Sequence, residues 1–448
     1  MKIGKTLHPT PHTPHPTPTE KLFAANPIYS LPTMTIDSLL QPFQRFGVNL
    51  GLERIKNLLE ILGNPQDKIP IIHVTGTNGK GSVCAYLSSI LSTAGYKVGR
   101  YISPHLIDWT ERISINGENI ETATLENLLK NLQSLIDPQQ ESPTQFEVIT
   151  AAAWLYFAQE KVDIAVMEVG LGGRLDATNV CAQPLVTVIT SISREHWQNL
   201  GPTVADIAGE KAGILKANCP AVIGQLPESA QGVVRERIKL LNCPTVWVEA
   251  AEKIADNRAK YQGLEYPLSL AGDFQLTNSA IAIAVVNILR QQGWQISDEV
   301  VQEGMAKTRW LGRLQTVNWC QREILIDGAH NPAAAIGLRQ YVDSLKAPKI
   351  IWVMGILSTK DHREIFQALL RKGDSLYLVP VPDHSSANPE TLAELAASIC
   401  PELSHLESCS DVFLGLKKAI QESADSRIIL CGSLYLVGYF LGSLFQGK

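Results

Sequence analysis

A glycine-rich segment near residue 80 constrains the fold of this chain more than any other sequence feature. The segment 76–82, GTNGKGS, follows a compact β-branched run at 68–74 and precedes a stretch with helical apolar spacing at 82–94. In the order strand, glycine loop, helix, backbone N–H groups and the helix N-terminus can hold phosphate oxygens, and Lys80 adds a positive charge there. The strict G-x-x-x-x-G-K-[ST] spacing is not met, since Val74 stands at the first glycine position. We therefore interpret the segment as a modified phosphate-binding loop rather than a plain glycine turn.

Strand-like and helix-like segments alternate after this loop. Apolar runs at 97–102, 164–169 and 185–191 are separated by stretches with helical periodicity at 123–136 and 146–159. Strands that alternate with helices are typical of parallel sheets covered on both faces. The sequence therefore predicts an α/β fold, with a P-loop-type, doubly wound and mainly parallel sheet in its N-terminal part.

The alternation restarts after residue 314, following a helix expected at 277–291. This restart predicts a second, smaller α/β domain of Rossmann-like type, with strands expected at 323–326, 349–354, 375–379 and 427–430. We expect a disordered tail at 1–20, because it is dense in Pro, Thr and His. The first domain is expected at 21–297 and the second at 298–448.

Composition argues against several classes of function. The chain has 448 residues and a formal net charge of -5, so no general basic field attracts nucleic acid or a membrane surface. Its longest apolar stretches are shorter than the roughly 20 residues that a spanning helix needs. Its eight cysteines include no C-x-x-C pair, which favours reduced and mostly buried thiols. We therefore expect a cytoplasmic protein that binds neither nucleic acid nor membrane.

Three chemically active side chains follow strands or helices of the first domain. Glu168 ends an apolar strand, where ligands of parallel sheets collect, and its carboxylate suits magnesium. His196 follows the next strand, and its residue chemistry favours a structural role and a site role about equally. Lys211 by itself reads as a surface charge paired with a nearby glutamate.

Taken together, the motifs resemble the folylpolyglutamate synthase and dihydrofolate synthase family, within the wider group of Mur ligases. The resemblance extends from about residue 40 to residue 438. The segments that carry it are 51–54, 76–82, 103–106, 146–147, 168–179, 196, 200–202, 210–213, 312–313, 327–332 and 432–436. So many motifs in the family's order are far more specific than any one of them.

The resemblance implies roles for individual positions. ATP contacts are implied for Thr77, Asn78, Gly79, Lys80, Gly81, Ser82, Asn278, Arg313 and Asp327. Magnesium ligands, for two ions, are implied at Ser103, Glu168 and His196. Lys211 takes the position of the family's carbamylated lysine, and His330 faces the cleft; these two, with Lys80 and His196, form the implied catalytic set. The implied pteridine pocket is lined by Gly47, Val48, Asn49, Leu50, Thr144, Gln145, Phe146, Glu147, Leu175, Asp176 and Ala177.

The activity that the resemblance implies is an ATP-dependent carboxylate–amine ligation. L-Glutamate would be added to dihydropteroate, to reduced folates or to both, through an acyl phosphate, by a monomeric enzyme. A peptidoglycan-type Mur ligase is the alternative, but such enzymes carry a substantial domain before the phosphate loop. A non-catalytic nucleotide-binding protein is disfavoured, because all the metal and activating positions are filled. The sequence leaves open which folate is used, and whether the new linkage is α or γ.

The sequence departs from the family pattern at three places. Glu195 stands where the family commonly has Asp before the metal-binding His, which would alter how that His is supported. Ile102 replaces a small hydroxyl residue before Ser103. The segment 383–385 replaces a more basic pattern, so the way in which glutamate carboxylates are held stays open.

Overall fold

The computed structural model describes residues 35–43, 50–137 and 139–445. Residues from Ile36 onward belong to one compact unit. The expected disordered tail at 1–20 lies outside the described residues, as do Gly47, Val48 and Asn49 of the implied pteridine pocket. The expectations for the tail and for these three pocket residues therefore stay predictions.

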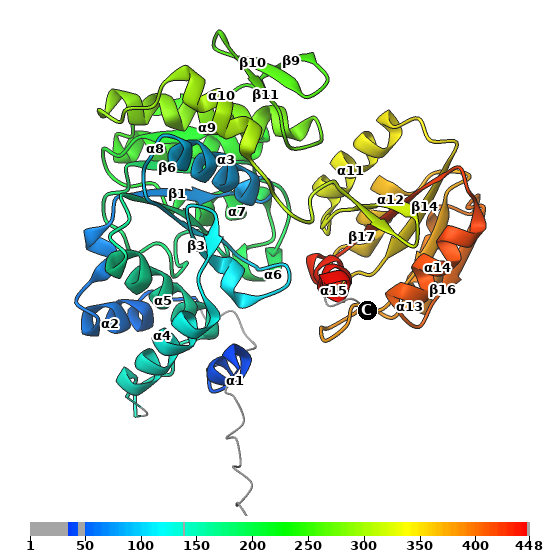
Figure 1. Ribbon diagram of the computed structural model, residues 1–448, viewed down its shortest axis with the longest axis horizontal. Helices are drawn as coiled ribbons and strands as arrows, with labels where there is room; N and C mark the ends of the chain where they lie inside the picture. The colour runs from blue at the N-terminus through cyan, green and yellow to red at the C-terminus, as the bar shows by residue number, and fades with distance from the viewer. Residues whose placement is uncertain (1–34, 44–49, 138, 446–448) are drawn as a thin grey trace, which may run out of the picture. The chain divides into compact units, whose positions relative to one another are not determined.

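The first sheet has eight strands and is parallel apart from one edge (Figure 1). Its order across the sheet is β4 (Glu118–Asn119), β3 (Ile113–Ile115), β2 (Val98–Tyr101), β5 (Ile164–Glu168), β1 (Ile71–Thr75), β6 (Val186–Ile189), β7 (Ala221–Ile223) and β8 (Thr245–Trp247). Strands β2 to β8 in this order pair in parallel, whereas β3 and β4 add antiparallel pairs. The predicted mainly parallel sheet is confirmed.

Helices cover both faces of this sheet, because successive side chains of each central strand point to opposite faces. On β1, Ile72 and Val74 belong to the core beneath α3 and α9, whereas Ile71 belongs to the core beneath α4 and α5. The helices of this part are α1 (Ile36–Leu40), α2 (Glu53–Ile61), α3 (Lys80–Thr93), α4 (Thr122–Leu135), α5 (Gln145–Gln159), α6 (Trp197–Leu200), α7 (Val204–Ala212), α8 (Glu228–Leu241), α9 (Phe274–Gln291) and α10 (Asp298–Lys307). Short 3-10 turns occur at Pro65–Lys68 and Trp109–Arg112.

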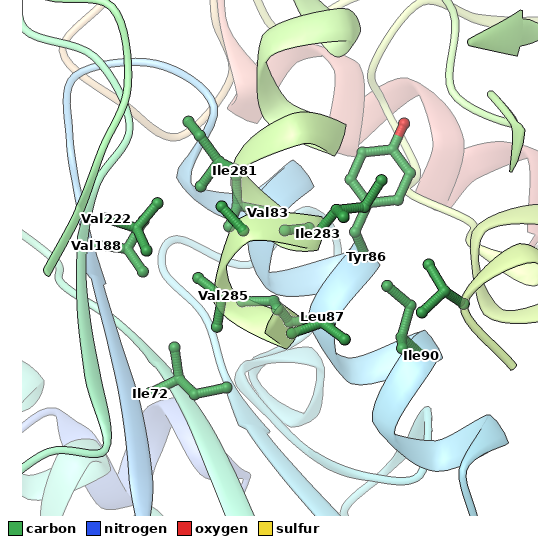
Figure 2. Close-up of a cluster of buried hydrophobic side chains, with 14 of the residues drawn as sticks. Ile72, Val83, Tyr86, Leu87, Ile90, Val188, Val222, Ile281, Ile283 and Val285 are labelled. Atoms are coloured by element: carbon green, nitrogen blue, oxygen red, sulfur yellow. The ribbon is translucent and has the colours of Figure 1, made fainter. Parts of the chain in front are cut away.

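The core on the α3 face holds the helix of the phosphate loop in place. Figure 2 shows apolar side chains of β1, β6 and β7 meeting those of α3 and α9. The residues labelled there are Ile72, Val188, Val222, Val83, Tyr86, Leu87, Ile90, Ile281, Ile283 and Val285, and all are almost fully buried. A helix that is apolar on this side is fixed against the sheet, so its N-terminus is fixed at the carboxyl end of β1.

A small antiparallel sheet and a second parallel sheet complete the architecture. The small sheet has the order β11 (Leu264–Pro267), β10 (Arg258–Tyr261) and β9 (Glu252–Ala255). The second sheet has the order β12 (Gln315–Trp319), β13 (Arg322–Ile326), β17 (Ser426–Cys431), β14 (Lys349–Met354), β15 (Ser375–Leu378) and β16 (His405–Ser408). Only β12 pairs antiparallel in the second sheet.

The second sheet is also covered on both faces, as the Rossmann-like prediction requires. Helices α11 (Pro332–Ser344), α12 (His362–Leu369) and α13 (Pro389–Ile399) pack on one face, and α14 (Val412–Glu422) and α15 (Leu434–Phe445) on the other. On β14, Trp352 and Met354 face the first group, whereas Ile351 and Val353 face the second. The expected α/β fold class is therefore confirmed for both sheets.

Helix α10 follows the expected domain boundary near residue 298 but packs on the first sheet's core. Val301 and Met305 are buried with the α3 residues, and the Ser89 hydroxyl donates to the Gly304 carbonyl at 2.6 Å. A Cβ on Gly304 would lie 2.5 Å from the Ile90 Cα atom. The boundary stays a prediction, and a division after Lys307 keeps this packing within one domain.

Two expectations from composition can be compared with the described residues. All eight cysteines are free thiols, and six of them are buried. Among the described residues, no helix is long and apolar enough to cross a membrane.

Candidate functional site

The phosphate loop, residues 76–82, joins β1 to α3 and is held by the residues that follow β6. The Thr77 N–H donates to the Ser191 carbonyl at 2.7 Å, and the Asn78 N–H donates to the Ser191 hydroxyl oxygen at 3.0 Å. The Thr190 hydroxyl donates to the Asn78 carbonyl at 2.6 Å. These bonds hold the loop against the residues that follow the neighbouring strand.

Two glycines of the loop admit close neighbours that any side chain would displace. Gly79 has φ +90°, and a Cβ there would lie 2.4 Å from the Asn278 Oδ1 atom of α9. A Cβ on Gly81 would lie 2.4 Å from the Trp310 ring. The loop is therefore packed between α9 and Trp310 at positions where only glycine fits.

Two lysine ammonium groups converge on one backbone carbonyl of the loop. Lys80 Nζ donates to the Gly76 oxygen at 3.1 Å and to the Thr77 oxygen at 3.2 Å. Lys211 Nζ, on α7, donates to the same Gly76 oxygen at 2.8 Å. Burial, together with the neighbouring Lys80 charge, lowers the pKa of Lys211 to about 7. The surface role that sequence chemistry alone suggested for Lys211 is wrong, because its side chain is buried.

The three implied metal ligands lie at or after the carboxyl ends of β2, β5 and β6, on one edge of the first sheet. Burial raises the pKa of Glu168 to about 7, although Lys80 and Arg313 oppose the shift. The Ser103 backbone N–H hydrogen-bonds the Glu168 carboxylate, and the buried Ser103 hydroxyl has no partner among the described residues. His196 lies at the end of the loop after β6, and nearly half of its side chain is exposed.

This donor set fits a divalent cation of the magnesium type. A buried carboxylate and an orphaned buried hydroxyl are hard oxygen donors, and a cation would satisfy both. The described part of the chain contains no group of three or more His, Cys, Asp or Glu side chains that could hold a metal ion.

One cavity of about 390 Å³ brings together every implied nucleotide and metal position. Its lining includes Thr77, Asn78, Gly79, Lys80, Gly81, Ser82, Ser103, Glu168, His196, Lys211, Asn278, Arg313, Asp327 and His330. These residues lie on loops and helices around the first sheet and on loops of the second sheet, and they are separated by up to about two hundred and fifty positions in the sequence. Their common placement puts the implied nucleotide, metal and catalytic positions around one cavity.

Asp327 and His330 follow β13 of the second sheet. Both oxygens of the buried Asp327 carboxylate accept backbone N–H bonds, from Leu314 at 2.9 Å and from Ala329 at 2.8 Å. Burial raises the pKa of this carboxyl, and Arg313 opposes that shift. The His330 ring contacts the Gly328 carbonyl through Nδ1 at 2.7 Å. Asp327 thus orders the loop that presents Arg313 and His330 to the cavity.

Glu195, the residue that departs from the family pattern, holds this part of the site together. Its carboxylate lies 2.9 Å from His330 Nε2 and 3.0 Å from Lys360 Nζ, and it accepts from Asn331 Nδ2 at 3.1 Å. Its distance to His196 Nε2 is 3.9 Å. Burial alone would raise the pKa of Glu195, but His330 and Lys360 outweigh burial and hold that pKa well below its usual range.

A second cavity, of about 440 Å³, adjoins the first. It is lined by the described residues of the implied pteridine pocket, Leu50, Thr144, Gln145, Phe146, Glu147, Leu175, Asp176 and Ala177. The two cavities share Ser103, His196 and His330 in their linings. A ligand in the second cavity therefore meets the metal-ligand candidates at its boundary with the first.

The two acidic residues of the second cavity are engaged differently. Glu147 caps its own helix, accepting from the Thr144 N–H at 2.7 Å, and pairs with Arg54 at 3.1 Å. Its other oxygen, Oε1, is buried without a partner among the described residues, so it can accept a hydrogen bond from a ligand. Asp176 uses both oxygens on backbone and hydroxyl groups of its own loop, at Leu171 and Thr178. Asp176 therefore shapes the cavity wall.

Several lining residues of the second cavity were missed by sequence reasoning. Trp109, Arg112, Lys360 and Tyr435 all line it. Arg112 lies with its guanidinium carbon 4.4 Å from the Trp109 ring centroid and donates to His105 Nδ1 at 2.9 Å. Aromatic and basic residues are common on surfaces, so only the fold reveals that these four face a cavity.

Comparison with known proteins agrees with this geometry. Residues 74–286 match the family model described as "Mur ligase middle domain", and residues 312–443 match "Dihydrofolate synthetase, C-terminal domain". The chain is 34% identical over 431 residues to the folylpolyglutamate synthase of Lacticaseibacillus casei, covering 91% of this chain and 98% of that protein. It is 34% identical over 418 residues to the dihydrofolate synthetase of Saccharomyces cerevisiae, covering 88% of this chain and 97% of that protein.

A solved structure shows the same likeness in three dimensions. The structure of Escherichia coli FolC in complex with DHPP and ADP matches with a TM-score of 0.80 at 30% identity, covering 92% of this chain and 97% of that one. The sequence motifs, the fold and the residues that line the two cavities thus point to the same family. The chain belongs to the folylpolyglutamate synthase and dihydrofolate synthase family of ATP-dependent acid–amino-acid ligases, within the Mur ligases.

Proposed function

We propose that this enzyme uses ATP to join L-glutamate to dihydropteroate, to reduced folates or to both, through an acyl phosphate. The observation that carries the proposal is the pair of adjoining cavities, one lined by the phosphate loop and the other by the implied pteridine residues. A phosphoryl donor in the first and a carboxylate in the second would meet near Ser103, His196 and His330.

The chemistry needs activation of a carboxylate, which is a poor electrophile. A carboxylate oxygen attacks the γ-phosphorus of ATP, and the bond from that phosphorus to the β,γ-bridging oxygen breaks, so that ADP leaves. The glutamate amine then forms a bond to the acyl carbon and displaces phosphate, and the amine proton passes to solvent. Both steps require positioning and charge neutralisation rather than a protein nucleophile.

The residues of this chain supply those two requirements. Lys80 and the loop N–H groups that are not bonded to Ser191 would face the transferring phosphoryl group. Ser103, Glu168 and His196 would hold Mg²⁺, which supplies neutralisation of phosphate oxygens when bound. Arg313 lies close enough to Glu168 and Asp327 to influence the pKa of both, so it adds positive charge at the same rim.

Lys211 is proposed to carry a carbamate. Its pKa of about 7 leaves a substantial neutral fraction of the amine at physiological pH. The neutral amine attacks the carbon of CO2, a proton leaves to solvent, and a buried cation becomes an anion. That change removes the repulsion between Lys211 and Lys80 and creates an oxygen ligand for a second Mg²⁺.

A monomeric state and a cytoplasmic location belong to the same proposed function.

The substrate assignment is tested with purified protein, ATP, Mg²⁺ and glutamate. Dihydropteroate and tetrahydrofolate are offered separately, and products are counted by mass spectrometry. We expect one glutamate to be added to at least one of the two. Glutamate transfer only to a UDP-sugar peptide would instead support the peptidoglycan-type alternative and contradict the folate proposal.

Replacing the loop lysine tests the acyl-phosphate step. We expect Lys80→Ala to fold but to lose roughly 10²- to 10³-fold or more in turnover, because the charge that faces the transferring phosphoryl group is gone. The acyl phosphate is trapped as a hydroxamate with hydroxylamine, and circular dichroism checks the fold. Lys372→Ala, at an exposed lysine of the second sheet's surface, is the control. Normal turnover by the Lys80 variant would reject the mechanism.

Isotope labelling tests the carbamate. With ¹³C-bicarbonate, we expect a carbamate signal in the ¹³C NMR spectrum of the wild type that is missing from Lys211→Met. Lys372→Met should keep the signal. A wild-type spectrum without it, or a signal that persists in Lys211→Met, excludes modification at this lysine.

The stability difference between wild type and Lys211→Met should depend on pH in CO2-free buffer, because only the wild type carries the buried amine. The ordinary lysine pKa of 10.5 falls to about 7 in the folded protein, so the unfolded chain binds more protons between those values. Wild-type stability therefore rises with pH across that window, and the full penalty applies below pH 7. We expect Lys211→Met to be more stable than wild type at pH 6, by at most about 5 kcal/mol, with the difference shrinking towards pH 10. Thermal unfolding midpoints measured across this range check it; parallel curves for the two proteins would contradict the buried ammonium.

A further inference from the structure

A cavity of about 470 Å³ lies outside the candidate site. It is lined by one side of α3, the end of β2, the turn at Asn116 and Gly117, and the end of α10. Helices α3 and α10 are labelled in Figure 1. None of its lining residues lines either of the two cavities described above. It is therefore a separate pocket on the same part of the chain.

The lining of this cavity, which we call the α3 pocket, carries only positive charge. Arg100, Lys307 and Arg309 line it, and none of its lining residues is acidic. Lys307 pairs with Glu303 at 2.5 Å, but more than half of each side chain is exposed, so this pair neutralises little. Arg309 donates through Nη1 only to backbone carbonyls of its own segment. The pocket thus presents a cationic surface that the exposed Lys307–Glu303 pair offsets only slightly.

Arg100 is the least compensated of the three. Its Nε atom is buried without a hydrogen-bond partner among the described residues. The contact described for its guanidinium is with the Trp310 ring, whose centroid lies 5.4 Å from Cζ. Burial lowers the pKa of Arg100, with Cys84 and Glu168 opposing that shift. A largely desolvated guanidinium without a hydrogen-bonded acceptor is costly, and an anion would relieve that cost.

A buried hydroxyl at the same pocket gives an independent indication of a ligand. Ser88 is 5% exposed, lines the pocket, and has no hydrogen-bond partner for Oγ among the described residues. Its neighbours on α3 are satisfied, since Ser89 donates to the Gly304 carbonyl and Ser92 to Asn116 Oδ1. A buried hydroxyl oxygen and a buried guanidinium nitrogen, from two residues that line the same pocket, therefore both lack a hydrogen-bond partner among the described residues.

We propose that the α3 pocket binds the phosphate group of a small molecule, with Arg100 and Ser88 donating to its oxygens and Lys307 and Arg309 at the rim. A phosphate near neutral pH carries more than one negative charge and several acceptor oxygens, so it matches three cations better than a single carboxylate does. The guanidinium fork also suits phosphate geometry. The ligand is either free phosphate or a phosphomonoester.

The pocket is tested by calorimetric titration of inorganic phosphate and, separately, glycerol 2-phosphate into the full chain saturated with ADP and Mg²⁺. We expect the double variant Lys307→Gln/Arg309→Gln to bind roughly threefold to tenfold more weakly, with an unchanged KM for ATP. Arg371→Gln/Lys372→Gln is the matched control, because Arg371 also donates to local carbonyls and Lys372 also pairs with an exposed glutamate. Equal weakening in both double variants, or in neither, would overturn the proposal.

Lys80→Ala separates this pocket from the phosphate loop. Binding in the α3 pocket should persist in that variant, whereas phosphate held by the loop is lost; loss of all binding in Lys80→Ala would therefore place the anion in the nucleotide cavity and overturn the proposal. Binding of inorganic phosphate alone identifies the free ion as ligand, and binding of glycerol 2-phosphate identifies a phosphomonoester.

Arg100→Met gives a second readout. Phosphate should raise the unfolding midpoint of the wild type more than potassium chloride of equal ionic strength does, and it should not do so for Arg100→Met. In phosphate-free buffer this variant should be at least as stable as wild type, because a poorly paired guanidinium is removed. If Arg100→Met fails to fold, the rim variant still decides. A phosphate effect of equal size in wild type and Arg100→Met would contradict the assignment.

Discussion

Two ammonium groups share the carbonyl oxygen of Gly76, and the rest of the site depends on that arrangement. Lys80 and Lys211 reach the oxygen from opposite parts of the chain, the start of α3 and the end of α7. Two like charges in a partly desolvated place repel each other unless an anion joins them or one loses its proton. Both solutions serve the proposed chemistry: a nucleotide supplies phosphate charge, and a carbamate would make Lys211 anionic. The site is thus built to be incomplete without its anions.

The fold imposes this arrangement through backbone packing. The carboxyl ends of β1, β5 and β6 lie side by side because the strands are parallel and in register, for example Val74 beside Glu168 and Val188. The loop after β1 then meets the loop after β6. Helix α9 packs so closely on the loop after β1 that a side chain at Gly79 would not fit. The apolar contact of α3 with the sheet sets the position of the loop before any ligand arrives (Figure 2).

Sequence patterns predicted the central strands well, because buried parallel strands are continuous β-branched runs flanked by glycine or polar residues. Strand β14 has the predicted bounds, and β1, β5 and β13 differ from the predictions by a few residues. The small sheet of β9, β10 and β11 was not predicted, because its strands are largely exposed and carry no apolar alternation. The charge state of Lys211 also lay beyond the sequence, since burial and the approach of Lys80 are products of tertiary structure.

The departure at Glu195 shows what a single methylene group can do. An aspartate at this position, next to a metal-ligand candidate, would have a carboxylate about 1.5 Å nearer its own backbone. The glutamate instead extends to His330, Lys360 and Asn331, all from loops of the second sheet. One carboxylate therefore supports the metal-side loop and, at the same time, places His330 at the junction of the two cavities. The longer side chain does more than replace the shorter one: it joins the loop of the proposed metal ligand His196 to the second-sheet loops that line both cavities.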